Sequence, residues 1–114
     1  MDTLKNHFLH CCFLIALLLS SASMSGEAEG RITKVQILTN SKSVVFTIAG
    51  EIQDPASCNK WQTFAVTLPT TTGQAIFEIV KQAFLKELVV EVKGLGTCTS
   101  HWRSEDVKYI TVKK

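Results

Sequence analysis

Five short stretches of the chain carry the residue pattern of β-strands, either alternating or continuously apolar and bounded by turn residues. The first, 32–40, alternates, and Thr33, Val35 and Ile37 share one side of it. The polar residues before it, 27–31, are predicted to form a flexible terminus. The other strands are predicted at 43–50, 62–68, 88–94 and 107–113. The run 43–50 is apolar on both faces, as expected for a central strand, and the turn residues before it predict a hairpin with the first strand.

The hydrophobic period changes from two to 3.6 residues in segment 70–87, which predicts one helix. Thr71 and Gln74 have the spacing of a capping box. Phe77 and Leu85 lie beside the main apolar stripe and widen it. The wider stripe is either a broad contact with the core or a second buried face against another subunit. The stripe itself consists of Ile76, Ile79, Val80, Ala83 and Phe84.

Strand, strand, strand, helix, strand, strand is the element order of an OB-fold, a five-stranded barrel with a helix between the third and fourth strands. The sequence therefore predicts a mostly-β chain with one helix, in a single OB-fold domain that spans 26–114. Gly94 and Gly96 are predicted to form a bend rather than a phosphate-binding loop, because no helix follows them.

Residues 1–25 are predicted to be a signal peptide. The apolar run 11–19 has the length of a signal-peptide hydrophobic region and is too short to span a bilayer. Small residues at 21–23, or later at 26–28, offer cleavage positions. No later segment is long and apolar enough to cross a membrane. We therefore expect an exported protein, located in the periplasm or secreted from the cell.

The charge balance argues against two classes of partner. The chain of 114 residues has 12 basic and 10 acidic residues, a net charge of +2. Loss of the signal peptide removes Lys5 and Asp2, so the net charge stays the same. That balance favours neither a nucleic acid nor a membrane surface as the partner.

Cys58 and Cys98 are the cysteines that remain after the signal peptide. Two cysteines in an exported chain favour a disulfide. A zinc site needs about four ligands, and the mature chain adds only His101 to the two cysteines. A redox motif needs Cys-x-x-Cys spacing, which is absent. The disulfide would join the loops before the third strand and after the fourth, bringing Trp61 and Trp102 into one neighbourhood.

The residues around His101 form a weak case for catalysis. Ser100, Ser104, Glu105 and Asp106 are its neighbours in a loop, and neighbours in sequence seldom make a triad. Adjacent carboxylates on a strand would also point apart. We expect no enzymatic activity, no cofactor and no metal.

The two tryptophans lie among polar residues that suit ligand binding. An indole face stacks on the C–H side of a sugar ring, and the neighbouring cations and imidazole can bond hydroxyls or a carboxylate. The alternative is that one or both indoles pack over the disulfide or cover the barrel. A monomeric accessory protein (an inhibitor, an assembly factor or a stress protein) without glycan binding is the rival function. The candidate ligand-binding residues are Lys60, Trp61, His101, Trp102 and Arg103.

Several segments together resemble a known group of proteins. They are a cysteine, the strand FAVTL, the helix TTTGQAIFEIVKQAF, the strand LVVEVKG, then GTC and SEDVKYITV. Over 35–112 this order resembles small exported bacterial OB-fold proteins. That group is similar to the binding (B) subunits of pentameric AB-type toxins, notably the subtilase-cytotoxin and pertussis-like B subunits.

The resemblance implies a non-enzymatic, glycan-binding domain in a ring of five copies that carries a toxic partner subunit into a host cell. The helices of such a ring line its central pore, and Phe77 with Leu85 would suit the surface between neighbouring copies. The sialic-acid pocket of those toxins has no residue-by-residue match in this chain. Where the serine of that pocket would lie, the chain has Thr39, Asn40, Ser41 and Ser43.

Overall fold

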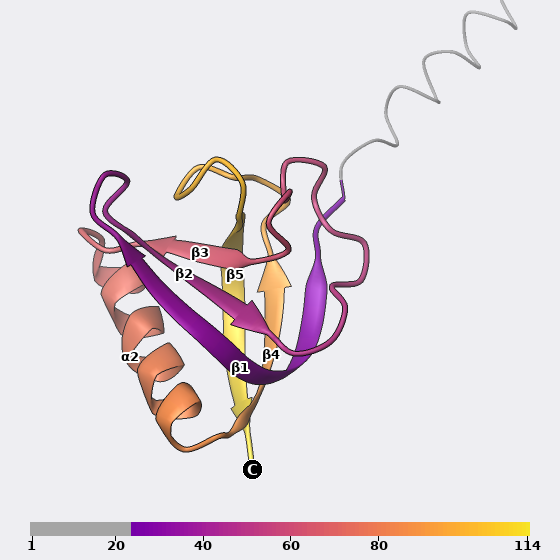
Figure 1. Ribbon diagram of the computed structural model, residues 1–114, viewed down its shortest axis with the longest axis vertical. Coiled ribbons are helices and arrows are strands. Elements are labelled where there is room, and N and C mark those ends of the chain that lie inside the picture. Colours follow the sequence, from indigo (N-terminus) through magenta and orange to yellow (C-terminus); the bar gives the residue numbers. More distant parts are fainter. Residues whose placement is uncertain (1–23) are drawn as a thin grey trace, which may run out of the picture.

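The computed structural model describes residues 24–114, so the predicted signal peptide lies almost wholly outside the described residues. The prediction of a mostly-β chain, with one helix between the third and fourth strands, is confirmed (Figure 1). Within the described part, the helix is not long and apolar enough to cross a membrane. In chain order the elements are β1 (Glu27–Leu38), β2 (Ser43–Ile48), β3 (Phe64–Thr67), α2 (Thr71–Leu85), β4 (Val89–Gly94) and β5 (Glu105–Lys113).

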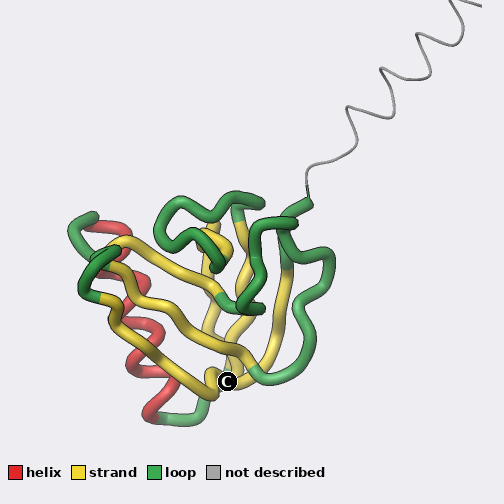
Figure 2. The backbone as a smooth tube through the Cα atoms, turned by 45° about the horizontal axis from the view of Figure 1, so that its top comes forward, coloured by secondary structure: helices red, strands yellow, loops and turns green. Residues whose placement is uncertain are grey.

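The five strands form one sheet that closes on itself. They pair in the order β1-β2-β3-β5-β4, and β4 pairs back to β1. The pair β3–β5 is parallel, and the other four pairs are antiparallel. Figure 2 shows α2 in red along one side of the yellow strands, where it packs against β1, β3 and β5. Closure leaves no strand without a hydrogen-bonded neighbour on either side, which protects a small sheet from pairing with other chains.

β1 is longer than predicted, because residues 27–31 form a strand rather than a flexible terminus. This first half pairs with β4, and the second half pairs with β2 in the predicted hairpin. The register shifts between Ile32 and Lys34 at the point where the strand changes partner. A shift of one residue moves side chains to the other face. Ile32 and Val35 therefore contact the core, whereas Thr33 is exposed and Ile37 is 55% exposed, contrary to the predicted shared face.

The core lies between the sheet and α2 and takes most of its side chains from β2, β3 and β4. Phe46 and Phe64, on paired strands, are fully buried with their ring centroids 6.0 Å apart. These two rings are the largest fully buried side chains of the described residues, so each contributes more hydrophobic stabilisation than a smaller core side chain. The buried cluster also includes Ala28, Ile32, Val44, Ile48, Val66, Val80, Ala83, Val90, Val92 and Val107.

α2 begins one residue earlier than the predicted capping box. The Thr70 hydroxyl accepts the Gly73 N–H at 2.9 Å, so Thr70 is the N-cap and the Thr71–Gln74 box does not form. A side-chain oxygen at this position satisfies one of the unpaired N–H groups of the first turn. Gly73 sits against the Thr67 carbonyl, where a Cβ would collide with the backbone. The close approach of the helix to the end of β3 therefore requires glycine.

The carboxylate of Glu105 ties three loop segments to the start of β5. Glu105 is fully buried, and its Oε2 accepts the Gly26 N–H at 2.8 Å and the Gly96 N–H at 3.1 Å. Its Oε1 accepts the Ala56 N–H at 2.9 Å. A Cβ at Gly94 would collide with this carboxylate, which accounts for glycine at the last residue of β4, whereas the predicted bend lies at Gly96. A buried carboxylate is tolerated only when hydrogen-bond donors replace water, and three backbone donors do so here.

The next carboxylate, Asp106, points to the opposite side and organises the loop after β4. Its oxygens accept the N–H and hydroxyl of Thr99, the hydroxyl of Thr97 and the N–H of Ser100, at 2.6 to 2.9 Å. Burial acts to raise the pKa of Asp106, but these hydrogen bonds to the charged form outweigh it and leave the pKa lowered. The loop is therefore wrapped around a carboxylate that stays ionised at neutral pH.

The predicted disulfide is confirmed and joins the two predicted loops. Cys58 in the loop before β3 is bonded to Cys98 in the loop after β4, with their Cα atoms 6.2 Å apart. Both loops lie at the top of Figure 1, one in magenta and one in orange. The bond closes a chain segment of 40 residues. It supports a non-reducing compartment for the folded protein, since disulfides persist there.

Replacing the Glu105 carboxylate should destabilise the fold. In Glu105→Gln one side-chain oxygen becomes an NH₂ group that faces a backbone N–H, so a buried donor loses its acceptor. We expect the free energy of unfolding in urea to fall by about 2 kcal/mol. Glu91→Gln is the control: that side chain is half-buried and pairs with Lys113 at 3.3 Å near the surface, and its loss should cost less than about 1 kcal/mol. Equal losses in both variants would contradict the assigned role of Glu105.

Removing the disulfide should destabilise the protein by restoring entropy to the unfolded chain. For a closed segment of this length the chain-entropy model gives about 4 kcal/mol. The double variant Cys58→Ser/Cys98→Ser should show a correspondingly lower urea midpoint. Reductant should lower the midpoint of the wild-type protein and leave that of the double variant unchanged. A wild-type midpoint that reductant does not move would contradict this role of the bond.

Candidate functional site

The structure brings together three rings that the sequence places on two loops, as predicted. Trp61 precedes β3, whereas His101 and Trp102 follow β4. The ring centroids of Trp61 and His101 are 4.3 Å apart, and those of His101 and Trp102 are 6.3 Å apart. The imidazole therefore lies between the two indoles, and the three rings form one aromatic cluster.

Backbone hydrogen bonds between the loops hold this cluster. Trp61 N–H donates to the Arg103 carbonyl at 3.0 Å, and Glu105 N–H donates to the Thr63 carbonyl at 3.1 Å. These bonds continue the β3–β5 pairing beyond the strand ends. Between the two contacts, Gln62 adopts a left-handed backbone conformation with φ 55°. Such a conformation is uncommon for a residue other than glycine, and it is maintained when the surrounding contacts fix it.

Both indoles remain accessible to solvent. Trp61 is 43% exposed and Trp102 is 65% exposed, although both lie beside the His101 ring. The Arg103 guanidinium lies over the Trp102 ring, with its Cζ 3.9 Å from the ring centroid. This cation–π contact restricts the orientation of an otherwise exposed indole. The exposure favours the binding interpretation of the tryptophans over packing beneath the loops.

His101 is almost completely buried, with 6% of its surface exposed. Its Nδ1 accepts the Arg103 N–H at 3.2 Å, and that ring nitrogen also lies 3.1 Å from the Ser104 hydroxyl. The Ser104 hydroxyl in turn contacts the Thr63 hydroxyl at 2.7 Å. Because Nδ1 is an acceptor, the neutral ring carries its proton on Nε2.

The electrostatic surroundings favour this neutral form. Burial lowers the pKa of His101, and the positive charge of Arg103 lowers it further. The imidazole is therefore neutral at physiological pH and presents Nε2–H as a donor.

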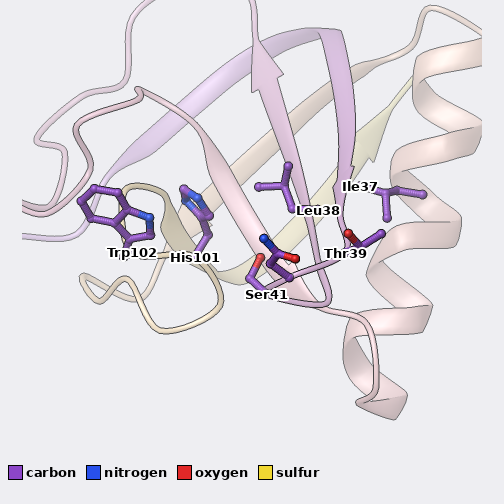
Figure 3. A pocket seen from close by; sticks show the side chains of 7 residues that line it. Ile37, Leu38, Thr39, Ser41, His101 and Trp102 are labelled. Atoms are coloured by element: carbon purple, nitrogen blue, oxygen red, sulfur yellow. The ribbon is translucent and has the colours of Figure 1, made fainter.

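A hollow of about 520 Å³ lies between the aromatic cluster and the β1–β2 turn (Figure 3). His101 and Trp102 form one wall, and Thr39, Asn40 and Ser41 line the turn on the other side. Ile37 and Leu38 at the end of β1 complete the lining. The hollow thus combines an indole face, apolar side chains and several short polar groups that both donate and accept hydrogen bonds.

The turn 39–41 lines the hollow, but its residues were not among the predicted ligand-binding residues. The sequence placed these residues only where a serine of the toxin pocket would lie. Nothing local in the pattern shows that a turn early in the chain faces a loop some 60 residues later, since closure of the sheet brings them together. A second hollow of about 400 Å³, almost wholly apolar, shares this hairpin end and is lined by Ile37, Leu38, Thr39, Lys42, Leu68 and Pro69.

Three of the five predicted ligand-binding residues, Lys60, Trp61 and Arg103, do not line the hollow. Trp61 reaches it only through its contact with the His101 ring. Lys60 is exposed on the loop beside Trp61 and does not line the hollow. Arg103 contacts Trp102 rather than the hollow, and its Nε is buried without a hydrogen-bond partner. Arg103 therefore supports the indole from outside the lining.

The hydroxyl nearest to His101 belongs to Ser104, which is fully buried and bonded to Thr63. Ser100, the other neighbouring serine, accepts a hydrogen bond from Thr67 at 2.9 Å instead. Both carboxylates that follow are bound to loop N–H groups, as described above. Within residues 24–114, no group of three or more potential metal ligands comes together.

The two residues assigned to an oligomer surface lie in different surroundings. Phe77 is half-buried and packs against the core cluster, which agrees with the broad core contact. Leu85, at the C-terminal end of α2, is 76% exposed. Ile79 and Phe84, predicted within the core stripe, also remain exposed. The helix therefore presents its core face through Gly73, Ile76, Phe77, Val80 and Ala83 and leaves three apolar side chains outside it.

Similarity to known proteins does not identify the site. The chain matches no protein-family model, no curated protein and no solved structure.

Proposed function

We propose that this protein is a non-catalytic binding module for saccharides, and that the hollow beside Trp102 is the binding site. The observation that carries the proposal is a highly exposed indole, fixed by Arg103, at the wall of a hollow that also carries the polar turn 39–41 and the apolar side chains of Ile37 and Leu38. A ring that is already held in one orientation loses little conformational freedom when a ligand stacks on it.

The chemistry of the lining supports a saccharide. The C–H face of a sugar ring packs on an indole, whereas its hydroxyls need short groups that donate and accept hydrogen bonds. Thr39, Asn40 and Ser41 supply such groups, and His101 supplies the Nε2–H donor. The lining has no ionised side chain while His101 is neutral, so its contacts suit hydroxyls.

The wider setting of the proposal is an exported OB-fold protein. The closed five-stranded sheet, with a helix between β3 and β4, supports the OB-fold. The disulfide supports export, with residues 1–25 as the signal peptide. The site lies on loops carried by the closed sheet, the arrangement in which binding residues are most often found.

We further propose that the protein assembles as a ring of five copies, as in the toxin binding subunits that its sequence resembles. The support in the structure is that three apolar side chains of α2, Ile79, Phe84 and Leu85, are exposed, and that Leu85 is 76% exposed. Exposed apolar side chains of this size can be covered by contact with another copy. A partner toxic subunit would then bind the ring rather than the single chain.

Loss of the Trp102 indole should weaken saccharide binding more than it weakens the fold. In Trp102→Ala, we expect at least a tenfold loss of affinity for a saccharide selected on a glycan array, which is about 1.4 kcal/mol. The free energy of unfolding should change by less than about 1 kcal/mol, because most of the indole is already exposed.

Tyr109→Ala is the matched control, since Tyr109 is an exposed aromatic residue on β5 that does not line the hollow. Its affinity should equal that of the wild-type protein. A Trp102→Ala protein that binds normally, or that loses stability and affinity together, would return Trp102 to a structural role.

The mass of the oxidised protein, measured by light scattering after size exclusion, should be five times that of the chain. Leu85→Glu should reduce this mass to that of a monomer, because a charge would be placed in the apolar contact. Ile37→Glu, a similar change at an exposed residue outside α2, should leave the mass unchanged. A monomeric wild-type protein without saccharide affinity would instead support the monomeric accessory protein.

A further inference from the structure

We propose that His101 is an acid-sensitive positioning residue: its neutral ring holds the site in the binding form, and its protonation releases the saccharide. The release of ligand rests on the saccharide site proposed above. The structural change in the loop does not, since it follows from the contacts of His101 alone.

The contact at Nδ1 of His101 depends on whether the ring is protonated. This nitrogen accepts the Arg103 N–H at 3.2 Å, so it must be free of a proton. When Nδ1 gains a proton, two N–H donors face each other. The Ser104 hydroxyl, 3.1 Å away, can accept from the protonated Nδ1, but the Arg103 N–H then has no acceptor.

Contacts with both loops hold the ring in place. It packs against Trp61 at 4.3 Å and is almost completely buried, although its edge borders the hollow. Its own backbone carbonyl accepts the Ser104 N–H at 3.2 Å. We therefore expect the opposed donors to separate by movement of Trp102 and Arg103, the two residues between these contacts.

The charged groups around the His101 ring come from several elements. Arg103 on the same loop is the nearest cation, and Lys60 lies on the facing loop. Glu105 and Asp106 at the start of β5 are bound to loop N–H groups, among them the N–H of Ser100 beside His101, which donates to Asp106. Lys42, on the β1–β2 turn, lines the neighbouring apolar hollow. No ion pair between His101 and a carboxylate is found in the described part of the chain.

These surroundings decide the direction of the pH effect. The indoles attract a cation, but burial and the Arg103 charge act against it, and the pKa of His101 lies below its ordinary value. The unfolded or opened loop therefore binds the proton more readily than the closed loop. Closure is most favourable above about pH 6.5, the ordinary pKa of histidine, and it weakens as the pH falls below that value.

The loop that carries His101 also forms part of the proposed ligand site. His101 and Trp102 together form one wall of the hollow, and Arg103 fixes the exposed indole from outside. A change that frees Arg103 from Nδ1 therefore disturbs both the orientation of the indole and the position of the Nε2–H donor. A saccharide bound at neutral pH loses its stacking surface after acidification.

The ligand-free experiment is an NMR titration of the oxidised protein from pH 7.5 to 4.5. The histidine signal that is missing from His101→Asn belongs to His101, whatever signals His7 and His10 give. We expect its protonation to coincide with loss of hydrogen-exchange protection at the Arg103 N–H and with a shift of the Trp102 indole N–H. Protonation of His101 without either change would overturn the proposal.

The binding experiment measures the affinity for the array-selected saccharide at pH 7.5 and pH 5. The wild-type protein should bind about tenfold more weakly at pH 5, a change of about 1.4 kcal/mol. His101→Asn keeps an acceptor near the position of Nδ1 and does not titrate, so its affinity should change less than twofold. His101→Gln is the second non-titrating variant if the asparagine variant does not fold.

The outcomes separate the two proposals. An equal pH dependence in the wild-type protein and in the non-titrating variants would overturn the role of His101 while leaving the saccharide site intact. Absence of binding to any saccharide at pH 7.5 would overturn the saccharide site and with it the release. The NMR titration would still decide whether His101 opens the loop.

Discussion

The buried carboxylate of Glu105 is the contact on which the arrangement of the loops depends. It binds backbone N–H groups at positions 26, 56 and 96, which precede β1, lie before β3 and follow β4. A fully buried carboxylate with unsatisfied oxygens is so unfavourable that these three segments have to remain in place together. The glycine at position 94 leaves the space that the carboxylate occupies. One side chain at the start of β5 thus fixes the positions of both site loops relative to the sheet.

Two further constraints act on the same loops at other points. The Cys58–Cys98 bond joins them covalently, and Asp106 gathers the segment 97–100 around its carboxylate. Since Glu105 and Asp106 are adjacent on a strand, their side chains point to opposite sides. The aromatic cluster lies on the same two loops, which the hydrogen bond from the Trp61 N–H to the Arg103 carbonyl joins. The loops therefore serve as a rigid support for the site although they contain little regular structure.

The sequence predicted those features that depend on local periodicity or on chemistry with few alternatives. The order of strands and helix was predicted from the change of hydrophobic period near residue 70. The disulfide was predicted from the two cysteines that follow the predicted signal peptide. The first half of β1 was missed because EAEGR is polar and gains its strand conformation only by pairing with β4. The register shift near Ile32 likewise arises where the strand changes partner. Glu105 and the burial of His101 gave no local signal, since each depends on segments 40 to 80 residues away that meet only in the closed sheet.

The same difference between local signals and long-range contacts explains which residues of the site were predicted. Trp61, His101 and Trp102 were found because the disulfide, predicted from sequence, brings their loops together. The turn 39–41 was left out because closure of the sheet, and not the disulfide, brings it to the hollow. A fixed site loses less conformational entropy on binding than a mobile one, and this raises its affinity. Yet a shallow hollow with a single indole still gives only a weak contact to one sugar. If several copies act together, the effective concentration at each further site multiplies that weak affinity. A rigid, weak site and a multimeric ring are therefore mutually consistent parts of one proposal, and acid opening at His101 would act on every copy of the site at once.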